Sequence, residues 1–231
     1  MKLNFINEKT KVVFEVSDYD SKYEDVFKSS FYAKKEGKYI KEYNKDEIYE
    51  GNLERIKTNF LKYGKEIFNQ MAYLKEAPWE EGLKEFIKKA KKQNIDWWLT
   101  GSCALSVRGI TVNPHDIDIM LNSKDENKII EIFGDSMIEP LCNSEDWVVK
   151  KFAVLFLKTR IDLAFDPLDS LDKPEPSDCG PYAQNHLEEI TWNSEKIKVP
   201  PIELQLKINK RRGRTTRVGL IQKYIEQQNH P

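Results

Sequence analysis

Residues 97–121, with the sequence WWLTGSCALSVRGITVNPHDIDIML, constrain the fold more than any other part of this chain. They combine an apolar run, a Gly-Ser pair, a short segment that ends at Gly109, and a second apolar run that holds two aspartates. This order predicts a strand, a turn into a short helix with a glycine at its C-terminal end, and a second strand. The chain is therefore expected to build a sheet with a helical connection between two of its strands.

Asp116 and Asp118 alternate with Ile117 and Ile119 along the second of these strands. Because the side-chain period of a strand is two, both carboxylates would point to one face and both isoleucines to the other. Two carboxylates about 7 Å apart repel by roughly 2 kcal/mol at an effective dielectric constant near 20. A bound cation would offset this repulsion, and Mg²⁺ prefers oxygen ligands of this kind. Solvent at an exposed strand edge is the alternative that the two aspartates leave open.

Gly101 and Ser102 follow the expected strand 95–99 and open the expected helix 102–108. Such a turn presents free backbone N–H groups and a serine hydroxyl, which are donors suited to an anion. A Gly-Ser pair alone is common in ordinary turns. Its position between a strand and a helix, followed after thirteen residues by an Asp-x-Asp strand, is much rarer and favours a phosphate site beside a metal site.

This arrangement resembles the signature of the polymerase β-like nucleotidyltransferase superfamily, and in particular its minimal members of the antibiotic-modifying and abortive-infection toxin types. The matching residues are Leu99, Gly101, Ser102, Asp116 and Asp118, with Thr100 where a small or apolar residue is commoner. The resemblance covers roughly residues 80–228. It also implies a third carboxylate in an apolar-acid-apolar triplet on a neighbouring strand, which Ile161, Asp162 and Leu163 supply.

Asp166, four residues after Asp162, competes with it for the role of the third acid. The two residues share a strand face by parity, but Asp166 precedes Pro167 and begins a proline-rich loop. Proline interrupts strands and restricts the residue before it, whereas Asp162 is enclosed by strand residues. Asp162 is therefore the expected third acid, and an exposed acid on an ordinary strand is the alternative.

The resemblance implies an α+β fold, with a mixed-sheet nucleotidyltransferase core flanked by helices. It implies that Asp116, Asp118 and Asp162 bind two Mg²⁺ ions and act as catalytic residues, with Asp162 as the general base. A nucleoside triphosphate would place its phosphates against Gly101 and Ser102; ATP binding is expected, and the preference for one base over another stays open. The implied reaction is in-line, two-metal transfer of a nucleoside monophosphate to an acceptor hydroxyl.

The most concentrated basic tract lies in the segment PIELQLKINKRRGRTTR, residues 201–217. Lys207 and Arg211 are four residues apart in it and would share one helical face. A solvated surface is the commoner role of such a tract. The resemblance implies instead that Lys207 and Arg211 contact the triphosphate, although Arg214 to Arg217 depart from the Arg-x-Lys-Asp that those families often carry.

The chain is expected to divide into a small N-terminal extension, residues 1–76, and a nucleotidyltransferase-like domain, residues 77–231. In the extension, strands are expected at residues 11–16, 31–34 and 38–43. A helix follows from near Asn52, with apolar residues at steps of three and four up to Leu74.

In the second region, Pro78 precedes another helix, and Ser123 with Glu126 predicts a capping box for a helix that Gly134 ends. The proline-rich segment 166–181 is expected, with equal weight, to be a substrate loop or disordered. A helix is also expected from near Ile202, within the basic segment. Four further strands are expected in two antiparallel pairs, at residues 147–157 with 160–165 and at residues 187–192 with 196–199.

The composition fits an intracellular protein. Charged residues make up 32% of the chain and the net charge is −1, so no global basic field attracts nucleic acid. The three cysteines are widely separated, which favours reduced, structural thiols over a zinc site. His115 faces away from both aspartates by strand parity and is expected to be packed or solvated. The N-terminus lacks the apolar core of a signal peptide, and no apolar run approaches the ~20 residues of a membrane span, so we expect a cytoplasmic protein without a membrane partner.

Two other classes of function remain open at this stage. A metal-dependent glycosyltransferase would use the Asp-x-Asp strand to hold a nucleotide-sugar, but it requires neither the Gly-Ser turn nor the third acid. A catalytically inactive interaction protein would keep the fold as a relic. The acceptor of a nucleotidyltransferase is equally open, since a small molecule, a protein hydroxyl or an RNA end would all accept the transfer.

Overall fold

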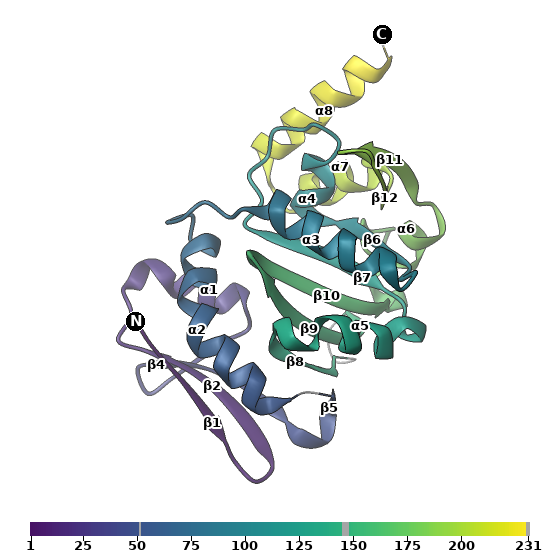
Figure 1. Cartoon of the computed structure of the whole chain (residues 1–231). Coiled ribbons are helices and arrows are strands. Elements are labelled where there is room, and N and C mark those ends of the chain that lie inside the picture. Colours follow the sequence, from purple (N-terminus) through teal and green to yellow (C-terminus); the bar gives the residue numbers. More distant parts are fainter. Residues whose placement is uncertain (51, 145–147, 230–231) are drawn as a thin grey trace.

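The computed structural model describes residues 1–50, 52–144 and 148–229. Its strands form a four-stranded N-terminal sheet, a six-stranded central sheet and a separate two-stranded ribbon. The N-terminal sheet lies at one end of the molecule, and the helices and ribbon of the C-terminal part lie at the other (Figure 1). The fold is α+β with a mixed central sheet, as the sequence predicts.

The N-terminal sheet is antiparallel and has the strand order β1-β2-β4-β3. Its strands are β1 (Lys2–Asn7), β2 (Lys11–Ser17), β3 (Ala33–Lys35) and β4 (Lys38–Asn44), with α1 (Glu24–Ser29) between β2 and β3. The expected strands at 11–16 and 38–43 are present, the strand expected at 31–34 is shifted to 33–35, and β1 and α1 were not predicted. The ring of Phe14 is fully buried and packs edge-on against Phe5 and Phe60, so aromatic side chains fill the core of this part.

Helix α2 (Leu53–Met71) connects the N-terminal sheet to the central sheet. The side chain of Asn52 accepts a hydrogen bond from the Arg55 N–H and caps the helix, as expected from its position. The helix contacts β1 on one side and β8 (Met137–Asn143) on the other, and the Asn59 side chain donates to the Met137 carbonyl. The predicted apolar stripe is confirmed over the helix itself. Leu74 lies beyond its end and is exposed.

The central sheet has the strand order β5-β8-β9-β10-β7-β6, in which only the β10–β7 pair is parallel. The other strands are β5 (Ile48–Glu50), β6 (Trp97–Thr100), β7 (Asp116–Leu121), β9 (Val149–Leu157) and β10 (Thr159–Pro167). The expected hairpin is present as β9 and β10, while Trp147 lies outside the described residues. Strand β8 was not predicted. Strand β5 belongs to the expected N-terminal extension but pairs with β8 of the central sheet. The domain boundary expected at residue 76 therefore stays a prediction.

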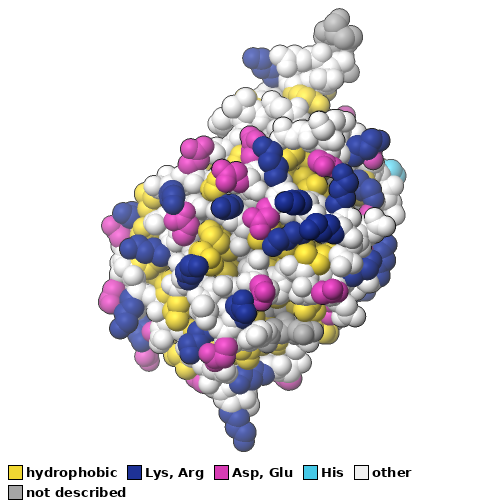
Figure 2. Space-filling model, viewed as in Figure 1, with side chains coloured by type: hydrophobic (Ala, Val, Ile, Leu, Met, Phe, Trp, Pro, Cys, Tyr) yellow, Lys and Arg dark blue, Asp and Glu magenta, His cyan; other side chains and the backbone are white. Residues whose placement is uncertain are grey.

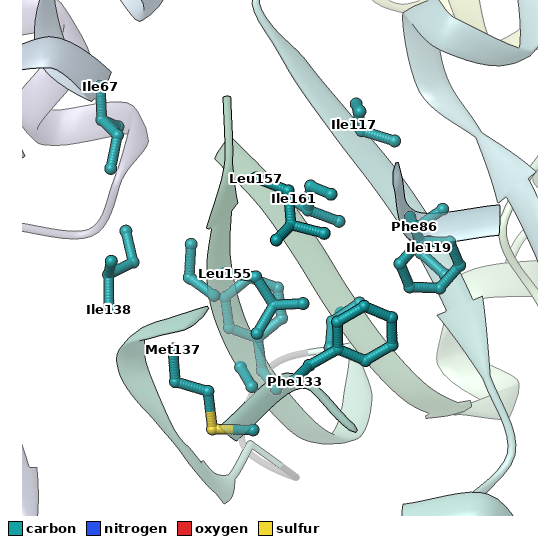
Figure 3. Close-up of a cluster of buried hydrophobic side chains, with 14 of the residues drawn as sticks. Ile67, Phe86, Ile117, Ile119, Phe133, Met137, Ile138, Leu155, Leu157 and Ile161 are labelled. Atoms are coloured by element: carbon teal, nitrogen blue, oxygen red, sulfur yellow. The ribbon is translucent and has the colours of Figure 1, made fainter. Parts of the chain in front are cut away.

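One face of the central sheet carries the apolar core. Helices α3 (Trp79–Lys92) and α5 (Glu126–Phe133) cover it, and the rings of Phe86 and Phe133 stack at 5.0 Å. Ile117, Ile119 and Ile161 lie in this core together with Leu155 and Leu157 (Figure 3). Since side chains alternate along a strand, this placement directs the aspartates of β7 and β10 to the opposite face.

The start and end of α5 differ from the expected capping box and glycine stop. A 3-10 turn, Ser123–Asp125, precedes the helix, and Asn122 rather than Ser123 supplies the cap through its bond to the Lys124 N–H. The carboxylate of Glu126 pairs instead with Lys151 of β9. Gly134 has a right-handed backbone (φ −52°) and continues into another 3-10 turn, so the chain ends α5 without a left-handed residue.

The remaining elements surround the end of the sheet that holds the aspartates. They are α4 (Gly101–Ser106), α6 (Pro181–Asn185), β11 (Glu188–Trp192), β12 (Glu195–Val199), α7 (Ile202–Arg211) and α8 (Thr215–Asn229). The expected strand pair and the expected helix near Ile202 are therefore present. Ile221 of α8 packs with Leu105, Ile110 and Ile202 in a small second core.

The surface carries charges of both signs. Figure 2 shows Lys and Arg side chains interspersed with Asp and Glu over the face that it displays, in line with the near-zero net charge. In the described part of the chain, no helix combines the length and apolarity that crossing a membrane requires.

Gly82 allows α3 to approach the central sheet closely. A Cβ at this position would lie 2.6 Å from the Leu157 carbonyl oxygen and 3.0 Å from the Thr159 methyl group. Gly219, in the middle of α8, has open space around it. We expect Gly82→Ala to destabilise the fold by about 1–3 kcal/mol through overpacking. Gly219→Ala, which gains the same helix propensity, should stabilise it by up to about 1 kcal/mol.

Urea denaturation followed by circular dichroism would measure both variants. Equal free energies of unfolding for the two would contradict the close packing of α3 on the β9–β10 hairpin.

Candidate active site

Three aspartates meet on the face of the central sheet opposite the apolar core. Asp162 of β10 pairs in register with Asp118 of β7, and Arg160 pairs with Asp116. One carboxylate oxygen from each of Asp116, Asp118 and Asp162 lies within 4.8 Å of the others, and in the described residues this is the one group of His, Cys, Asp and Glu side chains that is arranged to hold a metal ion. The sequence prediction of a converging acidic triad is therefore correct in its geometry.

The triad concentrates negative charge in a partly buried site. Burial raises the pKa of Asp118 well above its usual range, and the carboxylates of Asp116, Asp162 and Asp178 raise it further. Burial also raises the pKa of Asp162, although Arg160 opposes this shift. In the described part of the chain, Arg160 is the one Lys or Arg side chain paired with the triad. Negative charge at the triad therefore exceeds the positive charge paired with it.

The donor set suits a hard cation such as Mg²⁺. Oxygen ligands around an ion at about 2.1 Å lie about 3–4 Å from one another, which the spacing of the triad permits. Arg160 donates to both oxygens of Asp162 at 2.6 and 3.2 Å. Because each carboxylate oxygen has two lone pairs, this ion pair still leaves Asp162 able to bind a metal.

Gly101 lies directly against the triad. Its φ is +64°, and a Cβ there would lie 2.0 Å from the Asp118 Oδ2 atom. Its carbonyl accepts a hydrogen bond from the Gln205 side chain of α7, and Ser102 beside it is buried. Glycine is thus required here both for the left-handed turn and for the close approach to Asp118. The helix α4 ends at Ser106, earlier than the expected helix 102–108, and Gly109, at φ +85°, lies in the turn that follows it.

A cavity of about 250 Å³ adjoins the triad. Its polar lining comes from Thr100, Asp118, Asp162, Asp178 and Arg212. Its apolar lining comes from Met120, Val148, Val149, Phe152, Ala164 and Leu171. A polar, charged end next to an apolar wall suits a ligand that carries both phosphates and a flat apolar ring.

The proline-rich segment after β10 forms one wall of this cavity. Asp172 accepts hydrogen bonds from the Ser177 and Tyr182 N–H groups, at 2.8 and 2.6 Å, and so closes the segment into a compact loop. Thr100 donates to the carbonyl of Asp178 at 2.9 Å. Of the two expectations for this segment, its position favours a substrate loop over disorder.

Asp178 is a site residue that the sequence did not reveal. Its side chain is buried, burial raises its pKa, and Arg212 opposes that shift. Asp178 is one of several acids in this proline-rich loop and carries no periodic or motif signal, so only the path of the loop places it beside Asp118.

Helix α7 presents a different face to the site from the one predicted. Gln205, which contacts Gly101, and Asn209 are buried on the inner side of the helix. Lys207 is exposed, and at about 100° per residue it lies roughly 200° around the helix from Gln205. Arg211 pairs at 3.9 Å with Glu175 of the loop. Arg212, beyond the helix end, lines the cavity instead.

His115 lies beside Asp116, which corrects the orientation expected from strand parity. Its Nε2 atom is 3.5 Å from the Asp116 Oδ2 atom, and its Nδ1 atom is 2.6 Å from the Tyr73 hydroxyl. Strand β7 begins only at Asp116, so the alternation of side chains does not extend to His115. The contact with Tyr73 brings the turn after α2 to the edge of the site.

A side chain added at Gly101 would clash with the Asp118 carboxylate, whereas one added at Gly109 would not. Gly101→Ala should lower Mg²⁺-dependent nucleotide binding more than about tenfold, because the new methyl group displaces the Asp118 carboxylate. Gly109→Ala introduces similar left-handed strain, about 1–2 kcal/mol, into open space and should leave binding unchanged. Calorimetric titration with a non-hydrolysable ATP analogue and Mg²⁺ distinguishes them, and equal affinities would contradict the role of the close approach.

A family model matches the part of the chain that carries this site. The model of the aminoglycoside-2''-adenylyltransferases matches residues 82–165, a segment that contains Gly101, Ser102 and all three aspartates of the triad. This match confirms the resemblance to the antibiotic-modifying nucleotidyltransferases. It also confirms the prediction of an enzyme with a nucleotidyltransferase core. No curated protein sequence matches the chain.

Among solved structures, a candidate nucleotidyltransferase from Thermotoga maritima has 20% sequence identity and a TM-score of 0.46, over 63% of this chain and 91% of that one. The lincosamide antibiotic adenylyltransferase LnuA, bound to lincomycin, has 18% identity and a TM-score of 0.40, over 55% of this chain and 83% of LnuA. ANT(2'')-Ia in complex with adenylyl-2''-tobramycin has 13% identity and a TM-score of 0.39, over 60% of this chain and 84% of that protein. These loose likenesses assign no substrate to this chain.

Proposed function

We propose that this protein transfers a nucleoside monophosphate from a nucleoside triphosphate to the hydroxyl group of a small acceptor, with pyrophosphate as the leaving group. The observation that carries the proposal is the convergence of Asp116, Asp118 and Asp162, with oxygens within 4.8 Å of one another, directly against the turn at Gly101. ATP is the proposed donor, because the family that matches this segment consists of adenylyltransferases.

The proposed site holds Mg²⁺ through the three carboxylates of the triad, in the number of two ions that the superfamily implies. Bound there, the metal would offset the charge of the phosphates and lower the pKa of the acceptor hydroxyl. The raised pKa of Asp118 supports this assignment, because a buried cluster of carboxylates favours any added cation.

Other residues of the chain would bind the phosphates and accept the proton. Gly101 and Ser102 would face the phosphates with their backbone N–H groups, as the sequence suggests. Arg212 would add a charged donor from the opposite wall of the cavity. Asp162 would accept the proton of the attacking hydroxyl, and the two bonds from Arg160 hold its carboxylate in one orientation while it does so.

An aminoglycoside is the acceptor to test first, because the matching family takes its name from such substrates. A second cavity, of about 220 Å³, lies on the side of the site where His115 is placed. Tyr73, Glu76, Asn113 and His115 are among its lining residues, and they offer hydrogen-bonding groups, an aromatic ring and a carboxylate. These groups suit a polar acceptor rich in hydroxyl and amino groups.

Replacement of Asp118 tests the proposed reaction. Asp118→Asn should keep the fold but lower Mg²⁺-dependent transfer from α-labelled ATP by at least about 100-fold, because it removes the charge of a central metal ligand. Asp166→Asn is the matched control, since Asp166 lies on the same strand outside the triad and contacts the Ser123 N–H and, at 4.0 Å, the Lys150 ammonium.

The assay combines labelled ATP, Mg²⁺ and a panel of aminoglycosides, with a nucleotide-sugar as an alternative donor. Equal activity of Asp118→Asn and the natural protein would refute the mechanism. Transfer from the nucleotide-sugar in preference to ATP would favour the glycosyltransferase alternative.

The phosphate ligands on the basic segment form a separate prediction. The sequence assigns them to Lys207 and Arg211, whereas the cavity lining favours Arg212. We expect Arg212→Ala to weaken binding of the ATP analogue by about tenfold or more, through loss of a charge-assisted hydrogen bond. Lys207→Ala should change it little, because Lys207 lies on the outer face of α7. A larger effect of Lys207→Ala or Arg211→Ala in the same titration would restore the prediction from sequence.

A further inference from the structure

Arg160, the ion-pair partner of Asp162, also lies within electrostatic range of a second carboxylate. Its side chain is 4% exposed, and it interacts electrostatically with Glu139 of β8 as well as with Asp162. Burial alone would lower the pKa of Arg160, but these carboxylates outweigh burial and raise it. The guanidinium therefore stays charged, and its position depends on how the two acids share it.

Glu139 belongs to the same row of the central sheet as the triad. It pairs in register with Val154 of β9, which pairs with Asp162, which in turn pairs with Asp118. The register of β8 shifts on either side of Glu139, but the pairing at Glu139 itself and its electrostatic interaction with Arg160 and Asp162 place it on the face of the triad, two strands and about 10 Å from Asp162 along the sheet. The distance between Glu139 and Asp162 along this row leaves room for the Arg160 side chain between their carboxylates.

The N-terminal sheet supplies the partners of Glu139. Lys41 and Tyr43 of β4 each donate to its Oε2 atom at 2.6 Å. All three side chains are buried, and the Lys41 ammonium lies 5.5–5.9 Å from the ring centres of Phe31, Tyr32 and Tyr43. Burial alone would raise the pKa of Glu139, but Lys41 and Arg160 outweigh it and lower that pKa. Glu139 is thus a buried anion that depends on a cation from another sheet.

We propose that the N-terminal extension positions the catalytic carboxylate Asp162 through a buried line of alternating charges, Lys41, Glu139, Arg160 and Asp162. Lys41 and Tyr43 satisfy Glu139, which leaves the two donors of Arg160 free to hold Asp162. Without Lys41, the unbalanced charge of Glu139 draws Arg160 away from Asp162, and the metal site loses its orientation. Lys41, Glu139 and Arg160 are positioning residues in this arrangement.

The inference rests on the proposed function, and metal binding tests the two separately. Calorimetric titration of Mg²⁺ with a non-hydrolysable ATP analogue is carried out on the full chain, with thermal unfolding as the check of folding. Lys41→Met should lower Mg²⁺ affinity by about tenfold, in the range found when residues that orient metal ligands are replaced. Lys34→Met is the matched control, because Lys34 also lies in the N-terminal sheet, pairs with Glu24 at 2.8 Å and lies 5.8 Å from the Tyr39 ring, but on the surface.

A double variant separates charge from packing. In Lys41→Met with Glu139→Gln, the unbalanced acid is removed as well, so Arg160 should return to Asp162 and Mg²⁺ affinity should recover to within about threefold of the natural protein. A purely structural role for Lys41 predicts instead that the double variant is as weak as the single one or weaker. If Lys41→Met does not fold, Tyr43→Phe removes only a hydroxyl donor to Glu139 and should still lower Mg²⁺ affinity, in the same direction but less.

The outcomes are distinct. The inference would be overturned if folded Lys41→Met bound Mg²⁺ as tightly as the natural protein, or if the double variant did not recover Mg²⁺ affinity. If Tyr43→Phe is the variant used, an unchanged Mg²⁺ affinity would overturn it. Failure of the natural protein to bind Mg²⁺, or equal binding by Asp118→Asn, would overturn the proposed function and the inference with it. Loss of binding in Asp118→Asn together with full binding in Lys41→Met would leave the proposed function intact and remove only the role of the extension.

Discussion

The parallel pairing of β7 with β10 is the constraint on which the site depends. It places Asp162 level with Asp118 and on the same face, and it places Ile161 level with Ile117 on the apolar face. A register shift of one residue would send Asp162 into the core and an isoleucine into the site. The packing of Ile117, Ile119 and Ile161 under α3 and α5 therefore fixes the chemistry on the other side of the sheet.

The site has an excess of negative charge, and positively charged groups elsewhere in the molecule offset part of it. Three carboxylates of the triad and the buried Asp178 lie near one another, and Arg160 pairs with Asp162 alone. Burial makes each unpaired negative charge costly, which explains why the fold directs positively charged groups to this region. A divalent cation held by the triad would offset this negative charge.

The N-terminal extension is built into the same structure. Strand β5 joins the central sheet, α2 packs between the two sheets, and buried residues of both sheets belong to one continuous apolar core. A buried ion pair between Lys41 and Glu139 links the sheets at 2.6 Å. Loss of either member of a buried ion pair is destabilising, because the other charge is left buried without a partner. This pair therefore couples the folding of the extension to the structure of the site.

Local patterns in the sequence determined much of this protein. The parity of Asp116 and Asp118, the apolar stripe of α2 and the short connection between β9 and β10 all depend on neighbours along the chain, and the structure bears them out. Strand β8 escaped prediction, as it contains a proline and an acid among its apolar residues. The buried Glu139 is that acid, and its partners lie far away in sequence.

Tertiary structure alone decided which side chains surround the triad. His115, Asp178 and Arg212 reach the site from a turn, a loop and a helix end, where no periodicity predicts orientation. Lys207 fits the sequence pattern, yet the packing of Gln205 against Gly101 sets the rotation of α7 and turns Lys207 outward. The physical reason is the same in each case: sequence spacing fixes the face of an element, but only contacts with other elements fix where that face points.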